Sequence, residues 1–236
     1  MRNVSFSRPT KRERHSPGPV GRYLEDDGRH WWFHDNPDDC LLCPAGRVAS
    51  ETGSAACADC SDGYYVAAAG ATSCRYIEPG YYAETASLTP IICPSGRFSI
   101  GGSTSCTLCD AGTYQADSGQ TQCIAAEPGH FVKVAGATAS TPCPPGRFSL
   151  GASDTCVDCH AGTYQADSGQ TQCIAAEPGY VVAQEGAAAT TECDAGKFSS
   201  GGSTSCDSCG VGEFQPNGAK SSCKVRASCR SLFQLC

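Results

Sequence analysis

The spacing of the cysteines constrains this chain more than any other feature of its sequence. Nineteen cysteines occur among 236 residues, and sixteen of them form four blocks of four. The first cysteine of each block lies 50 residues after the first cysteine of the block before it. A fixed period of this size is typical of tandem repeats whose units are too small to bury a core of their own.

The composition favours a disulfide scaffold over a single globular core. Large apolar side chains are sparse, whereas the chain contains 27 glycines and 14 prolines. Covalent links must therefore replace buried apolar area. Cysteine at this density fits an oxidising, extracellular compartment, although residues 1–14 lack the apolar run of a secretory signal. We therefore expect a secreted or cell-surface protein of which this sequence is a fragment or an incomplete gene model.

The charge of the repeats argues against nucleic-acid binding. Residues 40–223 contain seven Lys and Arg against seventeen Asp and Glu, and the whole chain has a net charge of −7. Phosphate binding requires clustered Lys and Arg side chains. No stretch of the sequence is long and apolar enough to span a membrane. The expected partner is an unidentified protein ligand or the neighbouring domains of a larger parent chain.

The sequence divides into three segments. Residues 1–39 show no helical or strand periodicity and are predicted to be a disordered leader, with a candidate N-terminal cap at the apolar patch 31–33. Residues 40–223 are the cysteine-rich repeat array. Residues 224–236 are predicted to be a tail or a truncated further unit.

A shorter repeat lies inside the period of the cysteine blocks. A glycine recurs every 16 or 17 residues, and the residue two positions later is Tyr or Phe in nine of eleven cases. This unit, C-x2-G-x-(Tyr/Phe)…C, predicts a short strand after the glycine, a Gly-rich turn and a strand that returns to the next cysteine. We expect the aromatic rings to supply most of the apolar burial. The predicted fold class is small and disulfide-rich: an elongated tandem array of short β-hairpin loops with little or no helix.

The positions that lack cysteine indicate how the cysteines pair. Most junctions between units are C-x2-C, but every third unit lacks one cysteine at its start and one at its end. Joint loss is expected of bonded partners, because a thiol left without its partner is reactive. The lost pairs are Ile77 with Pro90, Ala126 with Ser140, and Ala176 with Thr190. The same rule predicts Cys43–Cys57, Cys60–Cys74, Cys93–Cys106, Cys109–Cys123, Cys143–Cys156, Cys159–Cys173, Cys193–Cys206 and Cys209–Cys223.

Three cysteines fall outside this rule. Cys229 and Cys236 are a candidate pair. Cys40 is a candidate unpaired residue, because its partner would lie in an upstream unit that this chain lacks.

The cysteine loops resemble a known family. The C-x2-G-x-(Tyr/Phe)…C loop, joined through C-x2-C junctions as between Cys93 and Cys109, resembles the ephrin-receptor-like cysteine-rich repeats over residues 40–223. These repeats belong to the growth-factor-receptor and tumour-necrosis-factor-receptor style of module. The resemblance implies an extracellular array of small β-hairpin loops that acts in adhesion or ligand binding. It implies no kinase activity, because the kinase glycine loop and catalytic-loop motif are absent from this sequence.

We interpret the chain as a non-enzymatic extracellular spacer or protein-interaction module, with no catalytic residue, cofactor or metal. The main alternative is an intracellular zinc-binding protein with reduced thiols. The pairs Cys40-x2-Cys43 and Cys57-x2-Cys60 lie at a spacing close to that of a zinc ribbon, but this spacing occurs only once. An enzyme is a third alternative, for which the sequence offers no paired carboxylates and no nucleophile with a base.

Overall fold

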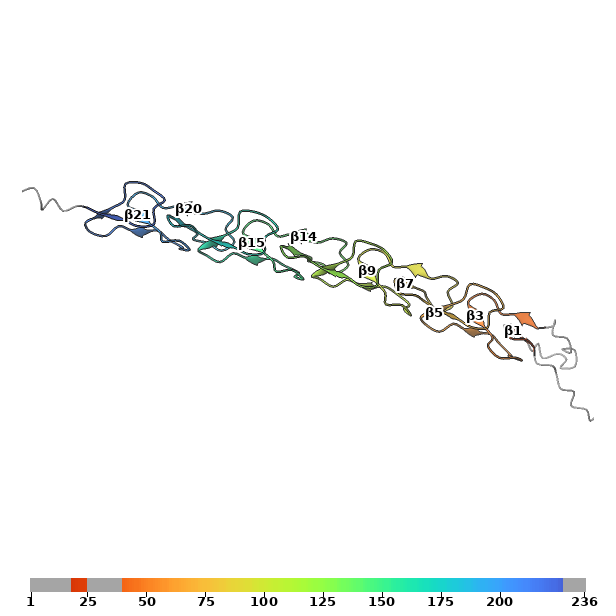
Figure 1. The fold of residues 1–236 in the computed structure, drawn as a ribbon. Helices are drawn as coiled ribbons and strands as arrows, with labels where there is room; N and C mark the ends of the chain where they lie inside the picture. Colours follow the sequence, from red (N-terminus) through yellow and green to blue (C-terminus); the bar gives the residue numbers. More distant parts are fainter. Residues whose placement is uncertain (1–17, 25–39, 227–236) are drawn as a thin grey trace, which may run out of the picture. The chain divides into compact units, whose positions relative to one another are not determined.

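The computed structural model of the protein describes residues 18–24 and 40–226. These residues form twelve antiparallel hairpins, each a separate two-stranded sheet, and the described ranges contain no helix (Figure 1). They divide into two compact units. The first contains the described residues up to Cys93 together with Ser99–Cys106, and the second contains Pro94–Phe98 and the residues from Thr107 onward. The prediction of a disulfide-rich hairpin array without helix is confirmed.

Every strand is two residues long and pairs with its neighbour in the chain. The hairpins of the first unit are β1 (Arg22–Tyr23) with β2 (Leu41–Leu42), β3 (Arg47–Val48) with β4 (Ala58–Asp59), β5 (Tyr64–Tyr65) with β6 (Arg75–Tyr76), and β7 (Tyr81–Tyr82) with β8 (Ile91–Ile92).

The second unit repeats the same pairing. Its hairpins are β9 (Arg97–Phe98) with β10 (Thr107–Leu108), β11 (Thr113–Tyr114) with β12 (Ile124–Ala125), β13 (His130–Phe131) with β14 (Thr141–Pro142), β15 (Arg147–Phe148) with β16 (Val157–Asp158), β17 (Thr163–Tyr164) with β18 (Ile174–Ala175), β19 (Tyr180–Val181) with β20 (Thr191–Glu192), β21 (Lys197–Phe198) with β22 (Asp207–Ser208), and β23 (Glu213–Phe214) with β24 (Lys224–Val225).

Backbone hydrogen bonds connect each hairpin to the next one within a unit. The Gly129 N–H, just before β13, donates to the Ser149 carbonyl of the following hairpin at 2.8 Å. The Val132 N–H, just after β13, donates to the Ser153 carbonyl at 2.9 Å. Because isolated two-stranded hairpins are marginally stable in water, this bonding to neighbours is needed to hold strands of two residues.

The core is built from two recurring positions. The first is the first-cysteine position of each repeat, which is buried at Cys43, Cys60, Ile77, Cys93, Cys109, Ala126, Cys143, Cys159, Ala176 and Cys193. The second lies three residues after the repeat glycine, and is buried at Ala49, Val66, Ala83, Ser99, Gln115, Val132, Ser149, Gln165, Val182, Ser199 and Gln215. The buried side chains are mostly small, so the disulfide sulfurs are a large part of what this fold buries.

The aromatic residues of the repeat are not among the fully buried side chains. Phe98, Tyr114 and Phe148 are half-buried, and Phe214 is exposed. The expectation that aromatic rings supply most of the apolar burial stays a prediction.

At the second recurring position, the buried glutamines Gln115 and Gln165 are hydrogen-bonded within their own loops, whereas Gln215 Oε1 has no partner among the described residues. The Gln115 Nε2 donates to the Gln122 carbonyl at 2.8 Å, and the Asp117 N–H donates to Gln115 Oε1 at 3.1 Å. Both groups of the amide are therefore hydrogen-bonded inside one hairpin turn, as burial of an amide requires. The same bonds recur around Gln165.

Residues 18–24 depart from the predicted disordered leader. They contain β1, which pairs with β2 so that Arg22 lies opposite Leu42. The Gly21 N–H donates to the Ala49 carbonyl at 2.8 Å, the same bond that later repeat glycines make. A hairpin thus begins at residue 18, ahead of the predicted array start at 40. At the other end, β24 extends the last hairpin past residue 223. The predicted cap at 31–33 lies outside the described residues.

Substitution of the repeat glycine tests whether hairpins two positions apart in the chain pack against each other. Gly129 has a φ of 85°, and a Cβ there would collide with the backbone carbonyl of Gly169, two hairpins further along. Gly196 has a similar φ of 80°, yet no described atom lies within 4 Å of its Cβ position. Gly196→Ala is expected to cost only the left-handed strain, about 1–2 kcal/mol.

Gly129→Ala is expected to cost more, because it adds a backbone collision to the same strain. Hydrogen exchange of the amides in the hairpins around each site measures the difference. Equal loss of protection in the two variants would contradict packing between alternate hairpins.

Candidate functional site: the disulfide ladder

Eight disulfides form the most regular feature of the structure, and together they are called the disulfide ladder below. Each joins cysteines 13 or 14 residues apart, with Cα–Cα distances of 5.6–5.8 Å. Closing a loop of about 15 residues is worth about 3 kcal/mol in the chain-entropy description. The bonds are Cys43–Cys57, Cys60–Cys74, Cys93–Cys106, Cys109–Cys123, Cys143–Cys156, Cys159–Cys173, Cys193–Cys206 and Cys209–Cys223, which are the pairs that the sequence predicts.

The ladder is interrupted at every third hairpin. In these hairpins an apolar residue fills the buried position of the first cysteine. Ile77 is 0% exposed there, and Ala126 and Ala176 are 3% and 2% exposed. The core therefore continues through the gaps without a covalent bond.

A carboxylate lies beside the second of these gaps, which is the unbridged hairpin β13–β14. Ser140, at the position of the missing second cysteine, donates from its hydroxyl to Glu127 Oε2 at 3.0 Å. The Tyr114 hydroxyl donates to Glu127 Oε1 at 2.9 Å. The Tyr114 hydrogen bond, a backbone hydrogen bond, the Ser140 hydrogen bond and the charge of His130 lower the pKa of Glu127 below its usual 4.5. These hydrogen bonds hold the end of the unbridged loop by polar contacts.

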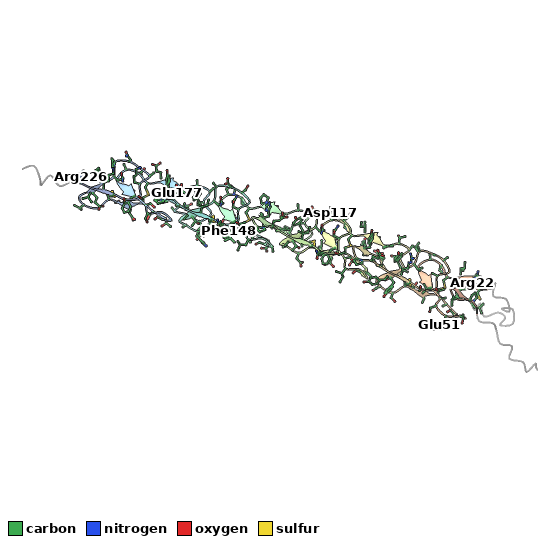
Figure 2. All side chains as sticks on the ribbon, in the orientation of Figure 1. Arg22, Glu51, Asp117, Phe148, Glu177 and Arg226 are labelled. Carbon is green, nitrogen blue, oxygen red and sulfur yellow. A yellow bond between two sulfur atoms is a disulfide. The ribbon has the colours of Figure 1, made fainter. Side chains whose placement is uncertain are left out.

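Cys40 has no disulfide partner among the described residues, and it is buried. The guanidinium of Arg22, whose side chain is labelled in Figure 2, donates to the Cys40 carbonyl at 2.9 Å. Gly18 occupies the place of a partner, since a Cβ on Gly18 would lie 3.6 Å from the Cys40 Cβ. This separation falls in the range of disulfides.

The expectation of a partner for Cys40 in an upstream unit is therefore corrected. The partner position belongs to the hairpin that starts at residue 18, and it is occupied by glycine. A sequence signal for it existed, because Gly21 and Tyr23 match the Gly-x-aromatic pattern with Gly18 three residues before. The candidate pair Cys229 and Cys236 lies outside the described residues.

The structure offers no support for the zinc alternative. Cys43, Cys57 and Cys60 are all in disulfides, and a disulfide sulfur is not the thiolate that zinc requires. Within residues 18–24 and 40–226, no three His, Cys, Asp or Glu side chains are grouped so as to hold a metal ion. The same residues include no helix of the length and apolarity needed to cross a membrane.

Part of the interrupted ladder matches a known protein family. Residues 96–143 and 146–193 each match the family described as tyrosine-protein kinase ephrin type A/B receptor-like. These two segments are ephrin-receptor-like cysteine-rich repeats. Each ephrin-receptor-like repeat spans nearly one period of the cysteine blocks, and thus two bridged hairpins and one gap. No curated protein is significantly similar to the chain.

The hairpin at 18–42 can be tested by completing its bridge. Gly18→Cys is expected to form a disulfide with Cys40, because the backbone at residue 18 already places the two Cβ atoms at bonding separation. The bond should add about 3 kcal/mol of stability. Peptide mapping under non-reducing conditions measures the link, and Gly18→Ser is the matched control. Free thiols at both positions in the folded variant would contradict the register of β1 and β2.

The Glu127 contacts predict a pH dependence at the second gap. A lowered pKa in the folded state means that ionised Glu127 contributes stability above its usual 4.5, and that this contribution is lost as the pH falls through the lowered pKa. An NMR titration of the Glu127 carboxyl carbon should give a midpoint below 4.5. Tyr114→Phe should raise that midpoint, whereas Tyr164→Phe, in the identical segment 161–179, should leave it unchanged. An unmoved midpoint in Tyr114→Phe would rule out the tyrosine as its main cause.

Proposed function

We propose that this chain is an extracellular, non-enzymatic region that acts as a spacer or protein-interaction module in a larger protein, with the spacer as the favoured role. The observation that carries this proposal is the use of the repeated residues. The cysteines are bonded to one another, and the residue three after each repeat glycine is buried between hairpins. The recurring side chains therefore support the scaffold itself.

An extracellular location is supported by the disulfide ladder. Disulfides at this density persist in secreted and cell-surface proteins and are rare where thiols are kept reduced. The ephrin-receptor-like repeats at 96–193 belong to a type of module found in receptor ectodomains, which favours the same location.

The spacer role is supported by the way the hairpins interact. The hairpin hydrogen bonds described above connect near neighbours in the chain, so stability is a sum of local contributions. An array of this kind changes length by whole repeats without a change in its core. The identical segments 111–129 and 161–179 are consistent with such lengthening by duplication.

A thiol count separates this proposal from the zinc alternative. In the intact protein under denaturing, non-reducing conditions, three or fewer of the nineteen cysteines should react as free thiols, with Cys40 among them. Most of the nineteen free, together with stoichiometric zinc in the native protein, would support the intracellular alternative. A Cys57–Cys60 link after partial reduction would overturn the pairing.

A further inference from the structure

The bridged and unbridged hairpins of the second unit make closely similar backbone contacts. In the unbridged hairpin β13–β14, Gly129 donates to Ser149 at 2.8 Å, and in the bridged hairpin β15–β16, Gly146 donates to Gln165 at 2.7 Å. The closing bonds are alike too, since Cys143 to Gly129 and Cys159 to Gly146 both measure 2.8 Å. The main difference between the two kinds of hairpin is the disulfide.

The disulfides determine which parts of the chain can be pulled straight. Tension that enters a bridged loop passes through the sulfur–sulfur bond, so the loop spans only its Cα–Cα distance of 5.6–5.8 Å. Between Cys43 and Cys223, three long stretches have no such bypass. They run from Cys74 to Cys93, from Cys123 to Cys143, and from Cys173 to Cys193.

We propose that the three unbridged hairpins between Cys74 and Cys193, namely β7–β8, β13–β14 and β19–β20, are the extensible elements of the bridged array. Under tension they open while the disulfide-closed loops keep their length, so the chain lengthens in limited steps. Each step releases at most about 70 Å, the fully extended length of about 20 residues. This inference rests on the spacer role proposed above. The two can fail separately, because a chain that has intact disulfides but extends without these steps disproves the extension mechanism and leaves the spacer role standing.

Single-molecule stretching of the full chain between end handles tests the proposal. With disulfides intact, three increments of at most about 70 Å each are expected between Cys43 and Cys223, in addition to the opening of the unbridged hairpin β1–β2. Reduction should roughly double the maximum extension between Cys43 and Cys223, because the eight bridged loops then also straighten. Increments well above the expected maximum in the oxidised chain, or no increments below the force that breaks the handles, would overturn the proposal.

Restoring one bridge provides a site-specific test. Ala126 and Ser140 stand at the two cysteine positions of the second gap, so Ala126→Cys with Ser140→Cys should close most of that stretch into a bridged loop. One of the three increments should then shorten by about 40–45 Å, and the other two should not change. Ala126→Ser with unchanged Ser140 is the matched control that adds a small polar side chain and no bond. Three unchanged increments in a variant whose peptide map shows the new bond would disprove the assignment.

Limited proteolysis of the unaltered oxidised protein gives an independent readout. The first cuts within the described array should fall in residues 78–92, 127–142 and 177–192, and should separate the fragments without reductant. First cuts spread evenly over bridged and unbridged hairpins would count against the proposal.

Discussion

The disulfide that joins the two ends of a hairpin loop is the interaction on which the rest of this structure depends. Strands of two residues and cores of cysteine, alanine and serine bury too little apolar surface to order a chain by themselves. The ladder lowers the entropy of the unfolded chain and places a sulfur in the core of each bridged hairpin. Hydrogen bonds to the next hairpin then complete each repeat.

The gaps in the ladder show how far this dependence can be relaxed. A hairpin without its bridge persists because bridged hairpins lie next to it along the chain and because its core position carries an apolar residue. Ile77 fills that position most fully, and alanine does so at 126 and 176. At the second gap, Glu127 accepts a hydrogen bond from the Ser140 hydroxyl, which stands at the place of the missing sulfur. Each period of the cysteine blocks therefore contains two hairpins closed by a disulfide and one hairpin that depends on its neighbours.

Much of this architecture was predictable from the sequence because its repeats can be compared with one another. The joint absence of cysteine at Ile77 with Pro90 indicated the pairing, and the glycine period indicated the hairpins. The buried position three residues after the repeat glycine was not predicted, because the sequence does not say which face of a two-residue strand the next hairpin covers. The start of the first hairpin was missed, because glycine stands at residue 18, where the bridged repeats carry the cysteine by which they are recognised.

The sequence by itself determined the repeat length, the hairpin class and the partners in the disulfide ladder, because each depends on spacing along the chain. The tertiary structure decided which side chains form the core, that residue 18 faces Cys40, and that Glu127 lies between Tyr114 and Ser140. These depend on contacts between residues of different strands and hairpins. Only the packing of neighbouring hairpins sets such contacts, since spacing along a chain does not fix the direction of a side chain.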